Sequence, residues 1–385
     1  MKRKYDVVIV GAGPAGATLA YELAGRGISV LVLEKAELPR YKCCAGGLTA
    51  KAAKLSGANI DEVAENVISA FTVTLAGDSP YQGDSDEPVM YTVRRENFDY
   101  ALVARAEKAG ADVLQGVEAL GIKFDDAGVE ILTSAGSFYS QLIAGADGAE
   151  SIVLKALGIK RKVDNIVGIT NEVFVADREL AKWKSRILID LGGISGGYGW
   201  VFPKADHLST GFACPVKKGK GLKRRYSEFL ASLNLGHYRI ARSDSSLLPV
   251  CAGKTTMAKG RAVLLGDAAG LASPLTGEGI YNAILSAKLA APAIEKSLQI
   301  GESCLDDYQK SVEKRIIAEM RIAHVFSRVL ALAPRRLFKL LKSDERVWRA
   351  CCRMLYGEME YSQVKSSIKA LGILYDLVLG GREKL

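Results

Sequence analysis

The sequence KYDVVIVGAGPAGATLAYELAGRGISVLVLE, residues 4–34, decides the fold. Apolar runs at 4–10 and 28–33 predict two β strands, and the segment 17–26 between them has the spacing of a helix. Glu34 follows the second strand directly. A strand, a glycine-rich turn, a helix, a second strand and an acid in this order are typical of a unit that binds an adenine dinucleotide.

The glycine turn indicates how such a ligand would be held. Gly11 allows a tight turn, Gly13 lets the backbone approach a pyrophosphate, and Gly16 lets the helix pack close to the sheet. The phosphates would lie at the helix N-terminus, where unpaired N–H groups and the helix dipole favour an anion. Glu34 would accept hydrogen bonds from a ribose hydroxyl. We therefore expect a bound dinucleotide rather than an empty turn.

Two later segments indicate which dinucleotide it is. LIAGADG at 142–148 and VLLGDAAG at 263–270 are apolar runs that end in an acid, and a helical stretch begins at Ile280. They resemble the GADG and GDAA motifs of the large group of FAD-dependent enzymes that includes aromatic hydroxylases. The resemblance places Asp147 and Asp267 at the cofactor, with Asp267 near the ribityl and pyrophosphate groups. Three motifs in the right order favour FAD over NAD.

Length and charge bound the class of protein. The chain has 385 residues, of which 49% are hydrophobic, and this is enough for a sizeable core and two or three subdomains. Its formal net charge of +9 is compatible with nucleic acid, anionic lipid or acidic partners. No nucleic-acid-binding motif accompanies the charge, so we expect no nucleic-acid partner.

Cysteine usage and hydropathy indicate the compartment. The seven cysteines include two adjacent pairs, 43–44 and 351–352, and neighbouring residues are poorly placed for an ordinary disulfide. No CxxC pair suggests zinc or an iron–sulfur cluster, so we expect no metal. Because the first strand begins at residue 4, we expect no signal peptide, and no apolar run reaches the length of a membrane span. We expect a cytoplasmic protein with free thiols; attachment to the inner face of the membrane stays open.

The spacing of the motifs predicts an α/β fold with a discontinuous, Rossmann-like FAD-binding domain of the glutathione-reductase or hydroxylase type. Short β runs bounded by Gly and Pro between residues 165 and 249 predict a mainly antiparallel sheet, which would roof the isoalloxazine. A third region is helical. The expected boundaries are 1–75, 95–165 and 252–305 for the FAD-binding domain, 76–94 and 166–251 for the substrate-binding β domain, and 306–385 for the C-terminal helical region.

One stretch of the helical region is both basic and apolar. Residues 335–349 contain six Lys or Arg side chains interleaved with Leu, Phe, Val and Trp. Such a basic amphipathic region is compatible with lying on an anionic membrane surface. It is equally compatible with a helical cap on the core that has a solvated basic face.

Three segments resemble the geranylgeranyl reductase family. PRYKCCAGGL at 39–48 is similar to its K-P-C-G-G-G-L stretch, VRRENFD at 93–99 to V-x-R-x-x-F-D, and GYGWVFP at 197–203 to Y-x-W-x-F-P. Cys43 stands where the family often has Pro, and Ala45 where it often has Gly. The loop is nearer to the chlorophyll-type and bacterial members than to the archaeal glycerolipid reductases.

The resemblance implies hydrogenation of isoprenoid C=C bonds by reduced FAD. It also implies that the aromatic motif lines a prenyl channel, since a long apolar chain needs rigid apolar walls. The cofactor-binding residues expected from the motifs are Gly11, Gly13, Ala15, Gly16, Glu34, Lys35, Cys44, Ala45, Gly47, Arg95, Val117, Asp147, Asp267, Gly279 and Ile280. The expected substrate-binding residues are Tyr198, Trp200 and Phe202.

The reaction needs a proton donor, because hydride addition to an unactivated alkene requires a proton on the other carbon. Cys44 is the first candidate, since the resemblance puts it beside the flavin and a buried thiol stays protonated. Tyr198 is the second. His207, His237 and His324 are interpreted as ordinary surface or core residues, because their sequence contexts show no partner.

Other functions share parts of these patterns. A flavin-dependent monooxygenase or halogenase is the first alternative, because the halogenase motif W-x-W-x-I-P partly overlays residues 198–203, with Tyr for the first Trp and Phe for Ile. A membrane-surface flavoprotein that passes electrons to quinone is the second. The electron donor, NAD(P)H or reduced ferredoxin, is left open. So are the prenyl substrate, which is a lipid, quinone, chlorophyll precursor or diphosphate, and the number of bonds reduced.

Overall fold

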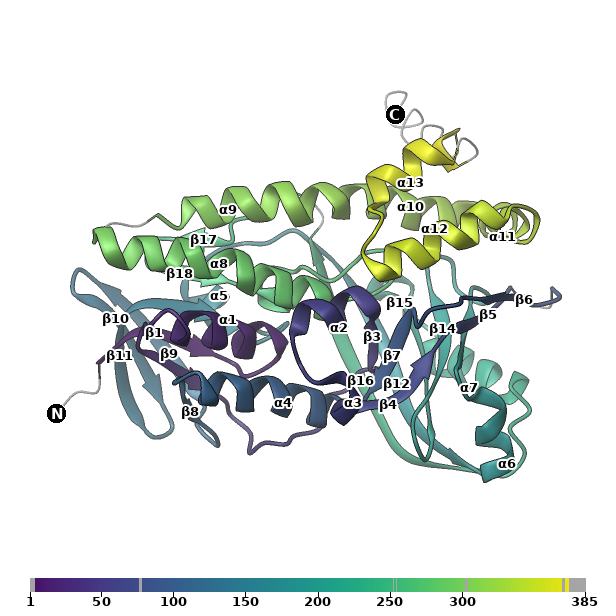
Figure 1. Cartoon of the computed structure of the whole chain (residues 1–385), viewed down its shortest axis with the longest axis horizontal. Coiled ribbons are helices and arrows are strands. Elements are labelled where there is room, and N and C mark those ends of the chain that lie inside the picture. The colour runs from purple at the N-terminus through teal and green to yellow at the C-terminus, as the bar shows by residue number, and fades with distance from the viewer. Residues whose placement is uncertain are drawn as a thin grey trace.

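The computed structural model describes residues 4–75, 78–251, 253, 255–301, 304–368 and 371–373. It has a larger sheet at one end of an elongated molecule, a second sheet at the other end, and the C-terminal helices beside the second sheet (Figure 1). The α/β class predicted from the motifs is confirmed. The expected helical region beyond residue 373, and its residues 369–370, lie outside the described residues.

The predicted βαβ unit is present at the centre of the larger sheet. β1 (Lys4–Val10) leads into α1 (Pro14–Ala24), and β2 (Val30–Leu33) pairs with β1 in parallel. The strand order along this eight-stranded sheet is β17-β18-β11-β1-β2-β8, and β9 and β10 extend β11 as an antiparallel meander. The remaining strands are β8 (Asp112–Leu114), β9 (Ala119–Asp125), β10 (Gly128–Thr133), β11 (Gly136–Gly145), β17 (Ala258–Lys259) and β18 (Ala262–Leu264).

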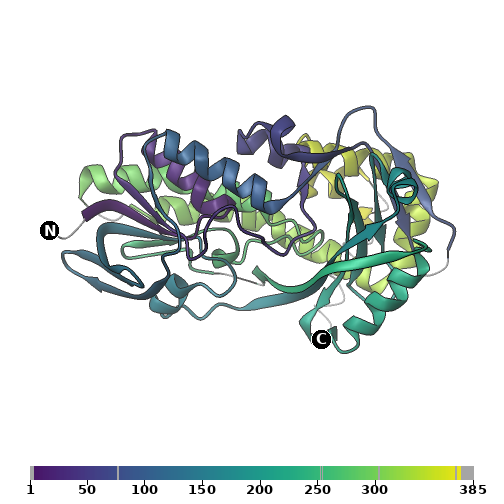
Figure 2. The same cartoon turned by 90° about the horizontal axis from the view of Figure 1, so that it is seen from below.

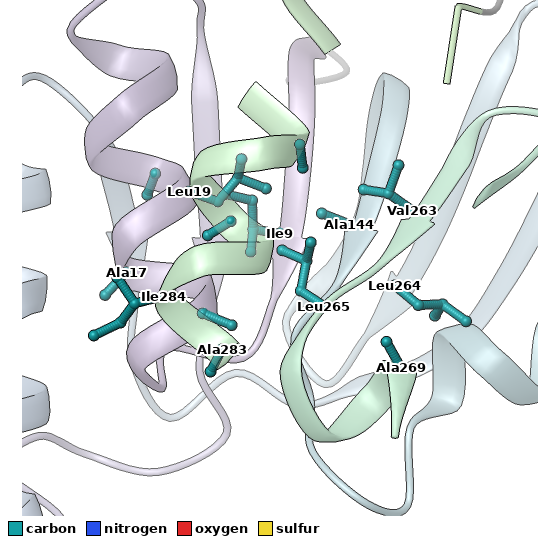
Figure 3. Packing of buried hydrophobic residues seen from close by; sticks show 14 of the residues in the cluster. Ile9, Ala17, Leu19, Ala144, Val263, Leu264, Leu265, Ala269, Ala283 and Ile284 are labelled. Carbon is teal, nitrogen blue, oxygen red and sulfur yellow. The ribbon is translucent and has the colours of Figure 1, made fainter. Parts of the chain in front are cut away.

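Helices cover one face of this sheet and form the largest core. α1 packs against both α4 (Arg95–Lys108) and α8 (Ile280–Ile300), the helix expected after the third motif. Leu19 of α1 and Ile284 of α8 lie with Ile9 of β1 in one fully buried cluster (Figure 3). The short side chains of α1, which is rich in alanine, permit this close contact.

A three-stranded antiparallel sheet joins the two ends of the molecule. It contains β3 (Gly47–Thr49), β7 (Met90–Val93) and β4 (Ala64–Ile68), in that order. Because β3 begins where the segment 39–47 ends, the sheet fixes that loop beside the start of α4. The short helices α2 (Ala50–Ser56) and α3 (Ile60–Val63) connect β3 to β4.

The second sheet has seven strands in the order β16-β12-β15-β14-β13-β5-β6, antiparallel except for β5 with β13. β5 pairs here, although the expected boundary at residue 75 puts it on the other side. The longest strands, β12 and β16, pair along most of their lengths and run toward the FAD-type sheet (Figure 2). The bounds are β5 (Ala70–Thr74), β6 (Tyr81–Asp84), β12 (Val163–Val175), β13 (Arg186–Asp190), β14 (Tyr198–Pro203), β15 (Leu208–Pro215) and β16 (Tyr238–Cys251).

The remaining helices pack on both sheets: α5 and α9 lie against the FAD-type part, and α7 lies on the second sheet. α7 packs on β15, and its Phe229 shares a buried apolar cluster with Phe212 of that strand. The bounds are α5 (Ile152–Ala156), α6 (Asp177–Leu180), α7 (Leu222–Ser232), α9 (Asp306–Val312), a π-helical turn (Glu313–Ile317), α10 (Ala318–Leu332), α11 (Pro334–Ser343), α12 (Glu345–Tyr356) and α13 (Tyr361–Ser367). No strand occurs among the described residues after 305, as predicted.

The basic amphipathic stretch turns its apolar side chains inward. Phe338 of α11 and Trp348 of α12 are buried. Trp348 lies edge-on to Phe71 at 5.4 Å, and its indole N–H donates to the carbonyl of Asp84 at 2.9 Å. This part of the chain is therefore a helical cap on the second sheet. None of the helices in the described ranges combines the length and hydropathy that a transmembrane span requires.

Candidate active site

The glycine turn after β1 adopts a shape that needs glycine. Gly11 has a φ of +98°, and a Cβ there would lie 2.5 Å from the Ala146 carbonyl oxygen, on the strand end that carries the second motif. A Cβ at Gly16 would collide with the Gly11 carbonyl. Gly13 precedes α1 without a side-chain cap, and a Cβ there would lie 3.9 Å from the Arg40 guanidinium. An uncapped helix N-terminus and a cation therefore face the position expected for a phosphate.

The acid after β2 lies directly beside this turn. Glu34 is buried, and its carboxylate accepts hydrogen bonds from the Ala12 amide at 3.0 Å and the Ala36 amide at 3.2 Å. The Val117 amide donates to the Glu34 carbonyl at 2.9 Å, which puts Val117 next to the expected adenosine position. Lys35, also expected at the cofactor, is exposed.

Two residues outside the expected set tie the ends of the site together. Arg40 pairs with Glu34 at 3.3 Å and with Asp99 at 3.1 Å, and Asp99 also receives both guanidinium contacts of Arg95 at 2.8 and 2.9 Å. Burial by itself lowers the pKa of Arg95, but the Asp99 carboxylate and the Cys44 sulfur raise it by more than burial lowers it. The pKa is therefore raised overall, and Arg95 stays charged. The available signals were Asp99 as the last residue of V-x-R-x-x-F-D and Arg40 within the 39–48 segment.

The loop that carries Cys44 is held in a tight turn. The Gly46 amide donates to the Cys44 sulfur at 3.3 Å, and Gly46 has a φ of +73°. Lys204, which follows β14, donates to the Ala45 and Val93 carbonyls, each at 2.8 Å. Burial lowers the pKa of Lys204 to about 8. This buried lysine therefore fixes the Cys44 loop to the end of β7.

The aromatic strand β14 contacts both loops that face the expected flavin. A Cβ at Gly47 would lie 2.5 Å from the Phe202 ring, so that ring packs directly against the Cys44 loop. The Tyr198 hydroxyl donates to the Thr276 carbonyl at 2.8 Å, in the turn before α8. Burial, with a smaller effect of Cys44, raises the pKa of Tyr198. Trp200 is buried in the same apolar cluster as Phe202.

The Trp200 indole packs against glycines of two strands of the same sheet, β15 and β12. A Cβ at Gly211, its partner across the ladder on β15, would collide with the indole, and one at Gly168 on β12 would lie 3.7 Å from it. Its indole N–H is buried and makes no hydrogen bond with the described residues. The motif therefore presents an apolar aromatic surface toward the Cys44 loop.

The remaining expected residues lie at the ends of β11 and β18. Asp147 accepts a hydrogen bond from the Ile152 amide at 2.7 Å through one oxygen, whereas its other carboxylate oxygen is buried without a partner among the described residues. Burial raises the pKa of Asp267, while Lys42, Arg95 and Arg161 act in the opposite direction. A Cβ at Gly279, the residue before α8, would lie 3.5 Å from an Asp267 carboxylate oxygen.

Together these residues fit FAD. The uncapped helix N-terminus at Gly13 suits a pyrophosphate, Glu34 suits a ribose, and the Asp147 oxygen without a partner among the described residues suits a hydroxyl donor. Ala15 and Ile280 lie in the first turns of α1 and α8, the two helices whose N-termini face this region. Their side chains are buried, so only their backbone could contribute to binding.

One histidine has partners that the sequence did not reveal. His207 is buried, and its ring nitrogens lie 2.8 Å from Glu172 and 2.5 Å from Asp206. Tyr41, in the loop before Cys44, also donates to Glu172 at 3.3 Å. This network joins β12 to the turn between β14 and β15. No group of three or more metal-ligating side chains occurs in the described part of the chain.

Comparison with known proteins agrees with this geometry. An FAD binding domain family model matches residues 4–186. The digeranylgeranylglycerophospholipid reductase 1 of Methanopyrus kandleri is 31% identical over 315 residues, which cover 77% of this chain and 82% of the relative.

Two solved structures show the same fold. A geranylgeranyl bacteriochlorophyll reductase-like protein of Thermoplasma acidophilum superposes with a TM-score of 0.81 at 24% identity, over the full length of both chains. A flavin-dependent brominase superposes with a TM-score of 0.78 at 19% identity, over 99% of this chain and all of the other. The family match, the FAD motifs and the reductase relatives all lead to the same conclusion. The chain belongs to the geranylgeranyl reductase family and is an FAD-dependent oxidoreductase.

Proposed function

We propose that this enzyme saturates C=C bonds in geranylgeranyl chains carried by a lipid. The observation that supports this most directly is the position of β14: Phe202 packs on Gly47, and Tyr198 is hydrogen-bonded to the turn before α8. An aromatic strand is thereby joined to both loops that face the expected flavin. A prenyl chain lying along this strand would approach the cofactor without meeting a charged side chain of the strand itself.

The surroundings of the strand suit an isoprenoid. Trp200 and Phe202 share one buried apolar cluster with Met90 and Ile187, and Ala45 of the Cys44 loop packs against it. Burying apolar surface contributes roughly 25 cal/mol per Å², so a long prenyl chain can be bound without polar contacts along its length. Rigid aromatic faces also stabilise cationic character that develops at a tertiary carbon.

The residues around Cys44 favour it over Tyr198 as the proton donor. When bound, reduced FAD supplies the hydride that adds to one alkene carbon. The Cys44 thiol would transfer its proton to the other carbon, and the thiolate left behind would be stabilised by the Gly46 amide and by Arg95. Tyr198 is less suited, since its hydroxyl already donates to Thr276 and burial raises its pKa. A proton from solvent would restore the thiol.

Anaerobic turnover of the reduced holoenzyme tests the proposal. Protein reduced with dithionite would be mixed with geranylgeranyl phospholipid, geranylgeranyl quinone, a geranylgeranylated chlorophyll precursor or geranylgeranyl diphosphate, and each product would be weighed by mass spectrometry. We expect a gain of two hydrogens, or a multiple of two, with the phospholipid. A gain confined to another carrier would reassign the substrate, and no gain with any of them would refute the reductase proposal.

The same preparation separates the alternatives and the electron donors. Oxygen-dependent hydroxylation or halide incorporation, with no hydrogenated product, would favour the monooxygenase or halogenase alternative. Electron transfer to a quinone headgroup that leaves its prenyl chain unsaturated would favour the electron-transfer flavoprotein. Under nitrogen, bleaching of the oxidised flavin by NADPH, NADH or reduced ferredoxin would identify the donor.

A further inference from the structure

Two segments far apart in the sequence contain basic residues without any acidic ones and account for the excess positive charge of the chain. Residues 215–227 and 320–343 contain twelve Lys and Arg residues and no Asp or Glu, whereas the formal net charge of the whole chain is +9. The second segment overlaps the basic amphipathic stretch, whose apolar residues Phe338 and Trp348 are buried. Any surface function therefore rests on what these segments leave exposed.

The structure brings the two segments into contact through one serine. The Lys218 ammonium donates to the Ser195 hydroxyl at 3.0 Å, and that hydroxyl donates to the Ala331 carbonyl at 3.0 Å. The 3₁₀ turn Val216–Lys218 thus lies beside the corner between α10 and α11. The exposed residues of this corner patch are Val216, Lys217, Lys218, Leu332, Arg335 and Arg336.

The corner patch combines unpaired cations with exposed aliphatic side chains. Leu332 is 70% exposed, the highest value among the large hydrophobic residues of the described chain, and Val216 is 46% exposed. Among the described residues, Lys217, Lys218, Arg335 and Arg336 have no ion-pair partner within 4.0 Å. Unpaired basic groups around a protruding leucine are typical of a surface that enters the headgroup region of an anionic bilayer.

We propose that the corner patch docks the protein on an anionic lipid bilayer, with Leu332 inserted and the four basic side chains at the headgroups. An acidic protein would match the charge, but ion pairs alone would not bury the exposed Leu332 side chain. The segment 195–197 that bridges the patch leads directly into Tyr198 of the aromatic strand. Docking would therefore place that strand one loop away from the bilayer, although vesicle binding itself does not depend on the proposed reductase activity.

Sedimentation with vesicles tests the docking. The FAD-loaded protein would be mixed with vesicles of phosphatidylcholine alone or with phosphatidylglycerol added, at low and high salt. Each basic residue at an anionic surface contributes about fivefold in affinity, so Arg335→Gln/Arg336→Gln should weaken binding roughly 25-fold. Leu332→Ser should weaken it by about tenfold, because the inserted side chain is lost. The matched controls are Lys160→Gln/Lys162→Gln, also exposed basic residues, and Leu120→Ser, a 54% exposed leucine of β9.

The expected result is binding to phosphatidylglycerol vesicles that falls with salt, falls in both patch variants and is unchanged in both controls. Three results would overturn the proposal: no binding to anionic vesicles, equal binding to neutral vesicles, or equal loss in patch and control variants. Patch variants that bind vesicles normally but lose reduction by ferredoxin would show that the patch receives an acidic protein, and would also overturn it. Since all substituted residues are exposed, unchanged thermal unfolding would confirm that the variants fold.

Discussion

Replacing Lys204 with methionine should remove a gain in stability that the natural protein shows between pH 7 and pH 10. The Lys204 side chain is only 3% exposed, and burial lowers its pKa from 10.5 to about 8. In the unfolded chain the ammonium keeps its proton up to the higher value. Between these two values the unfolded state binds more protons, so the free energy of unfolding rises with pH.

The size of the effect follows from the two pKa values. The ammonium destabilises the folded state by roughly 3 kcal/mol below pH 8, since each pKa unit is worth about 1.36 kcal/mol. About 2.5 kcal/mol of this is relieved between pH 7 and pH 10. Lys204→Met also loses the hydrogen bonds to the Ala45 and Val93 carbonyls, at about 1–3 kcal/mol for each group left unsatisfied. That loss is independent of pH, so the change with pH isolates the charge.

Urea unfolding followed by circular dichroism at several pH values measures the effect. The quantity to compare is the free energy of unfolding of the natural protein minus that of Lys204→Met, because other titrating groups cancel in this difference. Lys123→Met is the control, since the Lys123 side chain is 82% exposed. A difference that stays constant within about 0.5 kcal/mol from pH 7 to pH 10 would refute the view that Lys204 is a buried cation.

Three further predictions concern the cofactor, the reaction and the helical cap. Cys44→Ser should lower kcat for prenyl reduction by about 10²- to 10⁴-fold, as loss of a general acid does, while Cys43→Ser stays within a few-fold of the natural enzyme; equal losses in both would argue against a proton-donor role. Arg40→Gln should raise the FAD dissociation constant about tenfold in a flavin fluorescence titration, because Glu34 and Asp99 lose their shared cation, and Arg26→Gln should leave it unchanged. Trp348→Ala should lower the free energy of unfolding by about 3–5 kcal/mol in a urea titration, and an effect below about 1 kcal/mol would contradict its place in the core.

Local pattern was sufficient for much of the fold. The first βαβ unit, the helix from Ile280 and the strands β12, β13, β14 and β15 of the second sheet follow from hydrophobic periodicity and from the glycines that bound these runs. The pattern did not predict the other strands of that sheet, β5, β6 and β16. The membrane alternative for residues 335–349 shows where pattern alone is ambiguous. An amphipathic helix buries its apolar face on lipid or on protein, and the position of Trp348 against Phe71 shows that this apolar face lies on protein. Only the exposed side chains of the stretch can then meet a membrane surface.

The connections within the candidate site could not be predicted in the same way. Lys204 looks like a surface residue, because lysines are seldom fully buried. It becomes a buried donor only because β14 passes under the Ala45 and Val93 carbonyls, which come from distant segments. The ion pair of Arg40 with Asp99 spans 59 positions and likewise depends on tertiary structure.

The paired strands β12 and β16 have a mechanical consequence. Their ladder runs from Val163 and Cys251, near the FAD-type sheet, to Val175 and Tyr238 at the far side of the second sheet. This strand pair is roughly 40 Å long and hydrogen-bonded along its length, so it resists sharp bending at any one residue. Any hinge between the two halves would therefore lie at the Val163–Cys251 end of this ladder, where Val250 forms a bridge with Leu271 just after the third motif.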